Sequence, residues 1–330
     1  MAANGLAVPY SELKDVAARK MGWNRTTGSW TSVQTADFGV ALARALRYSY
    51  YRAVMTGERQ PHYWSFLSQV QKMDLYAPYA TGTITVSTTT CTLASGTWPS
   101  WAAAADIWIG GERYGVASRD SDSVLTLAES LTVASGTSYE LIQHYYPMPQ
   151  DFGSLLGDGF YYPRSSRIGQ TGKLTRIADG ALRRMDRDYY VTGYPDSFAL
   201  SFVAPADAST DSRQQVQFFP ITNGDRTLEY RYEVIPPKLD GSTYVYHHGG
   251  PWFSELLVAN LEDQLCRIVR HSEECAGSVQ AAIDAAVGYD RRTNAVDTLG
   301  HDSQCDPSML EYLVYDNRRY IPPANNTTPW

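Results

Sequence analysis

The segment from residue 81 to residue 143 constrains the fold more than any other part of the chain. It is rich in Thr, Ser, Val and Gly and sparse in charge, and short runs such as 82–86 and 124–127 alternate with a period of two. This period is typical of half-buried strands. Gly110 and Gly111 lie between two such runs, which predicts a tight hairpin. We therefore expect a small β-sandwich or barrel of about 60 residues, inserted between helical segments.

The residues before this segment read mainly as helices. We expect Ser11 to N-cap a first helix that ends at Gly22. A second helix is expected over about residues 36–55, because apolar and small side chains recur there at steps of four and three. Those side chains are Phe38, Leu42, Ala45 and Ser49. The run 62–73 is compatible with either a short helix or a strand.

The residues after the β-segment change from strands to helices. Runs at 198–203, 215–219 and 227–234 predict strands, and residues 178–187 predict a short helix. Pro251 is a favourable first helical residue. From Leu257 to Cys275, side chains follow one helical face over five turns, which predicts one continuous helix.

Together these patterns predict an α+β chain in five parts. They are an N-terminal helical part (1–80), an inserted β-module (81–143), a β-rich core region (144–250), a C-terminal helical part (251–305) and an extended tail (306–330). We expect the N- and C-terminal helices to form one helical bundle, because the ends of a domain often lie close together.

Composition argues against several functional classes. A net charge of −7 and a pI near 5.4 do not suit a basic nucleic-acid binder. No apolar run approaches the roughly 20 residues of a membrane span, and we expect no signal peptide. Five lysines among 28 basic residues leave 23 arginines, beside 24 tyrosines. Abundant Arg and Tyr with few Lys is a bias of protein–protein interfaces.

Motifs for catalysis or metal binding are absent from the sequence, so we expect no enzyme activity, cofactor or metal. There is no P-loop, Gly-x-Ser-x-Gly elbow or His-Glu-x-x-His pattern. The nearest metal-like set has spacings too long for a zinc site, and buried thiols are the favoured interpretation. This set comprises Cys266, His271, Cys275, His301 and Cys305.

Two further patterns are ambiguous. His247 and His248 are adjacent, so on a strand they would point to opposite faces and could not easily share one ion. Arginine clusters at 183–187, 291–292 and 318–319 have acidic neighbours. A solvated surface or local ion pairing explains these clusters, and contact with another subunit or with phosphate is the alternative.

Within residues 145–239, the phrase Tyr146-Pro-Met-Pro-Gln-Asp-Phe152 stands at the start of the β-rich core region. It is similar to the phrase Tyr-x-Leu-Pro-x-Asp-Phe, with Met148 in place of the usual Leu, of phage head-to-tail adaptor proteins of the tail tubular protein A type, which residues 145–239 resemble. A later proline and a Leu-x-Tyr-x-Tyr strand also match. The residues that carry the resemblance are Tyr146, Pro149, Asp151, Phe152, Pro220, Tyr230 and Tyr232. The inserted segment resembles a small β-module common in phage virion proteins.

The resemblance implies a structural virion protein at the neck of a bacteriophage. It implies a ring, commonly of twelve copies, that lies beneath the portal, joins head to tail and lets genomic DNA pass. The implied partners are further copies of the chain, the portal protein, and a downstream tail or nozzle protein or a tail fibre. Assembly would take place in the cytoplasm of the bacterial host, without a membrane, and the family carries no catalytic residues.

The alternatives are another tail-completion, stopper or fibre-attachment protein, and an enzyme with an unrecognised site. Under the adaptor interpretation, the tail is expected to dock on a neighbouring subunit or on the portal, because it is aromatic but too short to bury its own side chains. Its candidate contact residues are Tyr312, Tyr315, Arg318, Arg319 and Tyr320.

Overall fold

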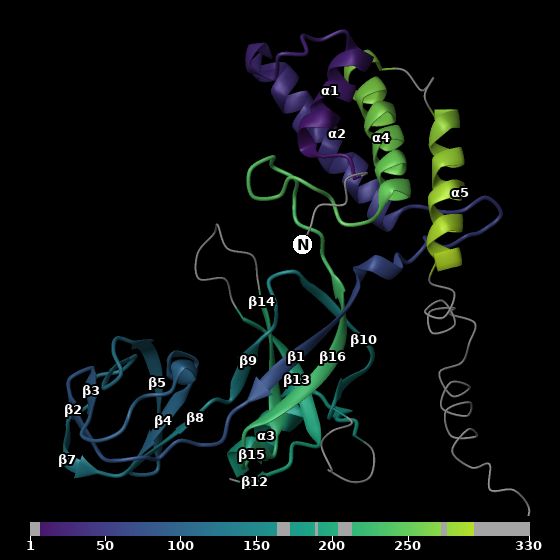
Figure 1. Ribbon diagram of the computed structural model, residues 1–330. Helices are drawn as coiled ribbons and strands as arrows, with labels where there is room; N and C mark the ends of the chain where they lie inside the picture. The colour runs from purple at the N-terminus through teal and green to yellow at the C-terminus, as the bar shows by residue number, and fades with distance from the viewer. Residues whose placement is uncertain (1–6, 164–171, 189–190, 204–212, 272–275, 294–330) are drawn as a thin grey trace, which may run out of the picture. The chain divides into compact units, whose positions relative to one another are not determined.

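The computed structural model describes residues 7–163, 172–188, 191–203, 213–271 and 276–293 (Figure 1). Within these residues the chain mixes helices and strands, so the expected α+β class is confirmed. The chain divides into two compact units. The helical unit contains the described residues up to Leu67 and from Pro236 onwards, and the β unit is Ser68–Ile235.

Four α-helices pack on a shared apolar core in the helical unit. They are α1 (Tyr10–Met21), α2 (Ser32–Tyr51), α4 (Pro251–Leu265) and α5 (Ala276–Thr293). Short 3₁₀ turns lie at Thr27–Ser29 and Ser65–Leu67. Helix α4 contacts each of the other three, and its leucines Leu257, Leu261 and Leu265 are completely buried. The side chains expected to form the inner stripe of α2 are also buried.

The starts of the first two helices differ from their expected positions. Helix α1 begins after Pro9 with no side-chain cap, so the prediction for Ser11 is wrong. Instead, the backbone N–H of Tyr10 donates to the carbonyl of Val245 at 2.8 Å. Helix α2 starts earlier than expected, because Thr31 and Gln34 form a capping box with hydrogen bonds of 3.2 and 2.9 Å.

The continuous helix expected through Cys275 is wrong. Helix α4 ends at Leu265 and continues as a π-helical turn, Cys266–Arg270. His271 then takes a left-handed conformation with φ of 53°, which stops the helix. A separate helix, α5, follows from Ala276.

The β-module is a nearly closed, antiparallel sheet of seven strands in the order β7-β2-β3-β6-β5-β4-β8. The strands are β2 (Ile84–Ser87), β3 (Thr90–Leu93), β4 (Asp106–Ile109), β5 (Glu112–Arg119), β6 (Val124–Leu127), β7 (Val133–Thr137) and β8 (Tyr139–Ile142), with a 3₁₀ turn at Ser100–Ala104. The predicted hairpin is confirmed: Ile109 pairs with Glu112, and the two intervening glycines have φ of 63° and 88°. Such positive φ values suit glycine.

The β-rich core of the same unit consists of three small sheets, with strand orders β1-β16-β10, β11-β13-β14-β9 and β12-β15. Their strands are β1 (Ser68–Leu75), β9 (Tyr145–Pro147), β10 (Phe152–Tyr161), β11 (Thr175–Arg176), β12 (Thr192–Gly193), β13 (Ser197–Val203), β14 (Arg213–Phe219), β15 (Ile221–Thr222) and β16 (Arg226–Val234), and helix α3 (Asp179–Asp188) belongs with them.

Strand β1 lies within the range expected to be the N-terminal helical part. It pairs along its whole length with β16, from Ser68 opposite Glu233 to Leu75 opposite Arg226. The run 62–73, compatible with helix or strand from its sequence, therefore ends as a strand after the short 3₁₀ turn. Side chains from the first two sheets meet in one aromatic core that contains Phe160, Phe198, Phe218 and Tyr230.

Candidate functional site

The residues that carry the family resemblance gather around the β-rich core. Tyr146, Phe152, Tyr230 and Tyr232 are buried in one apolar cluster. Asp151 lies in the turn that leads into β10, and Pro149 accepts the Phe152 N–H in that turn at 3.1 Å. Pro220 follows β14 through a cis peptide bond. Segments about 80 residues apart in sequence thus meet in one place.

Asp151 and Tyr232 form the polar contact within this group. The Tyr232 hydroxyl donates to Asp151 Oδ1 at 3.2 Å, and the Tyr232 and Phe152 rings stack with their centroids 5.6 Å apart. Burial, followed by the nearby Asp151 charge, raises the pKa of Tyr232 to about 12. The hydroxyl therefore stays protonated at neutral pH and acts as a donor that ties the turn to β16. This geometry holds the core together.

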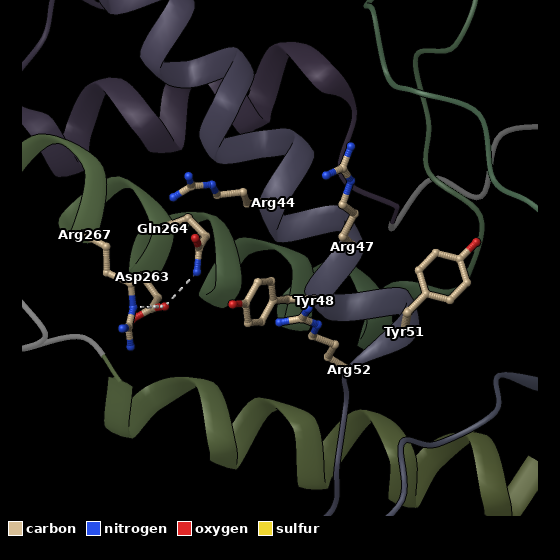
Figure 2. A pocket seen from close by; sticks show the side chains of 8 residues that line it. All are labelled: Arg44, Arg47, Tyr48, Tyr51, Arg52, Asp263, Gln264 and Arg267. Carbon is tan, nitrogen blue, oxygen red and sulfur yellow. Dashed lines mark hydrogen bonds and ion pairs between the residues drawn. The ribbon is translucent and has the colours of Figure 1, made fainter.

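A different group of residues forms a basic pocket on the helical unit. A pocket of about 590 Å³ lies between α2 and the end of α4 (Figure 2). It is lined by Arg44, Arg47, Tyr48, Tyr51, Arg52, Asp263, Gln264 and Arg267. Four of these eight side chains are arginines and one is acidic. The pocket is therefore basic in a chain that is acidic overall.

Only some of the charges in this arginine pocket have a partner of opposite charge. Arg267 Nε donates to Asp263 Oδ2 at 2.8 Å, and Gln264 Nε2 donates to the same oxygen at 3.1 Å (Figure 2). Arg52 lies over the ring of Tyr48, 4.9 Å from its centroid. Within the part of the chain that the structure describes, Arg44, Arg47 and Arg52 form no ion pair. Three positive charges are thus left to attract an acidic ligand.

This pocket was not predicted from the sequence. Its arginines are spread over residues 44–52 and at 267, so no dense cluster is visible. The available signal was spacing, because Arg44, Tyr48 and Arg52 recur every four residues and therefore share one helix face. Arg267 reaches the pocket only because α4 packs on α2, and no local sequence pattern predicts this.

In two of the arginine clusters that the sequence predicts, one described arginine forms an ion pair. Arg183 forms an ion pair with Asp179 at 2.9 Å. Arg291 makes a two-pronged contact with Glu58, with N–O distances of 2.6 and 2.8 Å. The partner of Arg183 is four residues away, as local ion pairing predicts, whereas Glu58 is far from Arg291 in sequence.

The candidate metal ligands that the structure describes have other surroundings. His247 is buried, and its Nε2 and Nδ1 lie 2.7 Å from the Ser254 hydroxyl and 3.0 Å from the His248 carbonyl. Burial lowers the pKa of His247. Cys266 lies buried in the π-helical turn. In the described ranges, no three His, Cys, Asp or Glu side chains are grouped to hold a metal ion.

Several predicted site residues lie outside the described residues. They are Cys275, His301 and Cys305 of the metal-like set, and the candidate contact residues Tyr312, Tyr315, Arg318, Arg319 and Tyr320. The predictions for them stay predictions.

Comparison with known proteins found no protein-family model that matches the chain and no significant match among curated proteins. Among the helices that the structure describes, none is both long and apolar enough to cross a membrane.

Proposed function

We propose that this protein is a structural component of a bacteriophage virion, a head-to-tail adaptor that forms a ring beneath the portal and lets DNA pass from head to tail. The observation that carries the proposal is the β-rich core. The two phrases that resemble the adaptor family, near Tyr146 and near Tyr230, belong to this one core. Because Asp151 and Tyr232 come from different phrases and hydrogen-bond, the resemblance involves residues that depend on one another.

The surface of the described residues supports a protein that works by contact. Large apolar side chains are exposed on elements of both units, among them Val33 on α2, Val70 on β1 and Phe202 on β13, with exposed fractions of 65%, 63% and 74%. Ring assembly uses two different faces on each subunit, which bury such side chains against neighbours. In this proposal the four helices act as a helical bundle and the β-module as an insertion.

Electron microscopy of the purified protein mixed with the portal protein of the same phage tests the proposal. Class averages should show rings of matching symmetry stacked on the portal, with twelve copies expected from the family resemblance. A protein that stays unbound beside intact portal rings would contradict the adaptor function. The portal alone is the matched control, since it reveals any ring that does not contain this chain.

Deletion of residues 306–330 should impair head–tail joining and leave the rest of the protein folded. The reason is the sequence of the segment, which carries three tyrosines and two arginines as candidate contacts. Co-sedimentation with the portal measures joining, and circular dichroism during heating measures folding. A full-length variant with Arg318→Gln and Arg319→Gln separates the arginine contribution from that of the tyrosines. Undiminished joining by the truncated protein would refute the expected role of the segment.

A further inference from the structure

The arginine pocket combines unpaired positive charge with a buried acidic group. Arg44 and Arg47 are exposed on α2, and neither has an ion-pair partner among the described residues. Arginine binds carboxylate and phosphate groups through parallel hydrogen bonds, which are about twice as strong as neutral ones. The pocket therefore suits a ligand with at least one anionic group.

Asp263 indicates that the ligand also carries a hydrogen-bond donor. This residue is only 5% exposed, and its Oδ2 receives the hydrogen bonds from Arg267 and Gln264. Its Oδ1 is buried and has no hydrogen-bond partner among the residues that the structure describes. A buried carboxylate oxygen without a partner is costly, so a ligand that brings an N–H donor would remove this cost. A phosphodiester backbone has no such donor, and Asp263 would repel it.

The dimensions and the aromatic lining also fit a peptide. The row from Arg44 to Arg52 extends over about 12 Å at 1.5 Å per residue, enough for several residues of an extended chain. Tyr48 and Tyr51 lie beside the arginines and are 40% and 45% exposed. Tyr and Arg are the residue types most often found at the energetic centres of protein–protein interfaces.

We propose that this pocket binds an acidic segment of another polypeptide chain. Carboxylates of the segment pair with Arg44, Arg47 and Arg52, and an N–H group of the segment donates to Asp263 Oδ1. Tyr48 and Tyr51 cover the aliphatic parts of the bound segment. The inference goes beyond the proposed ring, because it assigns a ligand to the helical unit that a single copy of the chain binds without assembly.

Fluorescence anisotropy of the full chain with short labelled ligands tests this assignment. One ligand is a peptide of alternating Glu and Gly, its matched control has Gln in place of Glu, and a third is a single-stranded oligonucleotide of similar length. The Glu peptide should bind, and its affinity should fall as salt is raised. The Gln peptide should bind at least about tenfold more weakly, because it lacks the charge-assisted hydrogen bonds. No binding of the Glu peptide, or tighter binding of the oligonucleotide, would overturn the assignment.

Variants locate the binding within the chain. The double variant Arg44→Gln with Arg47→Gln should weaken binding of the Glu peptide by about tenfold or more, since each arginine donates to a carboxylate. Arg59→Gln is the matched control, because Arg59 is an exposed arginine of the same unit outside the pocket. Unchanged affinity of the double variant, or equal losses in both variants, would place the binding elsewhere and overturn the assignment. Thermal melts verify that both variants fold.

A third comparison tests the role of Asp263. A Glu–Gly peptide whose backbone amides are N-methylated keeps its charge but has no backbone N–H donors. It should bind several-fold more weakly than the parent peptide, as expected for a lost hydrogen bond to a charged group. Equal affinities would overturn the part of the inference that rests on Asp263. Because these assays need neither rings nor portal, their failure is distinguishable from failure of the adaptor function.

Discussion

Phe160→Ala is expected to destabilise the β unit by about 3–5 kcal/mol, the usual cost of removing a buried aromatic ring. Phe160 is completely buried between two sheets. Its ring centroid lies 5.0 Å from that of Phe198, 5.1 Å from that of Phe218 and 4.9 Å from that of Tyr230. Because these partners come from three different strands, removal of the ring leaves a cavity that the sheets cannot easily close.

The backbone before Phe160 forms a bulge that depends on Gly159. The pairing of β10 with β16 shifts register between Leu156 and Phe160. Gly159 takes a φ of 102°, and a Cβ at this position would lie 2.6 Å from the Phe198 ring. The bulge therefore needs glycine, and Phe160 follows it with the ring in the core.

Urea unfolding monitored by near-ultraviolet circular dichroism measures this effect, because the buried tyrosines of the core lose their packed surroundings when the β unit unfolds. Phe160→Leu is the matched control, and this more conservative apolar exchange should cost less than the alanine variant. If Phe160→Ala cost less than about 1 kcal/mol, Phe160 would not be central to the packing between the two sheets.

Local sequence signals predicted the β unit better than the helix ends. The hairpin at Gly110 and Gly111 and the strand 227–234 were predictable because their turn residues and alternation are local properties. The end of α4 was not, because apolar spacing continues through Ile268 while the backbone changes to a π-helical turn. Periodicity reports which side chains face the core, but it does not report the backbone hydrogen-bond pattern.

The residues of the family resemblance and the arginine pocket also differ in how far the sequence predicts them. The two phrases of the family resemblance were visible in the sequence, but their contact through Asp151 and Tyr232 depends on the pairing of β10 with β16. The arginine pocket was not predicted, because Asp263 and Arg267 reach Arg44 only when α4 packs on α2. Long-range packing brings together residues that no spacing rule connects.

Asp290→Ala is expected to destabilise the helical unit by about 3–5 kcal/mol, because it removes the buried carboxylate that accepts three hydrogen bonds, and each donor left unsatisfied costs about 1–3 kcal/mol. Asp290 on α5 is 6% exposed. Its Oδ2 accepts from His62 Nε2 at 2.8 Å and from the Ser65 N–H at 3.1 Å, and its Oδ1 accepts from the Ser65 hydroxyl at 2.6 Å. The substitution would leave these buried donors without a partner.

Helix α5 also bonds the loop that follows α2 at two more places. Asp290 is therefore the buried part of a larger attachment between this loop and α5. Thr56 donates to Asp284 through its N–H and its hydroxyl, and Arg291 pairs with Glu58. Asp284→Asn is the matched control, since Asp284 lies on the same helix but is only partly buried. Asp284→Asn should lower the stability of the helical unit much less than Asp290→Ala, because water replaces the lost contacts.

The attachment should also weaken in acid. Burial raises the pKa of Asp290, but the hydrogen bonds from His62 and Ser65 outweigh burial, so the pKa lies below its usual value of 3.8. An acid whose pKa is lowered in the folded state adds stability above its unfolded pKa. This contribution is complete above about pH 4 and is lost as the pH falls through the folded value. The stability of the wild-type protein should therefore fall below about pH 4. The stability of Asp290→Ala should fall less over the same range, because the variant lacks this carboxyl group.

Hydrogen exchange with mass spectrometry distinguishes this local effect from general unfolding. In Asp290→Ala, peptides from residues 53–67 and from α5 should exchange roughly a hundredfold faster or more, since each 1.4 kcal/mol corresponds to a factor of ten. Peptides from the β unit should be unchanged. Unaltered exchange in both regions of the helical unit would mean that the His62–Asp290–Ser65 contacts contribute little. The buried donors would then have found other partners, and the attachment of α5 would depend on Thr56, Glu58 and apolar packing.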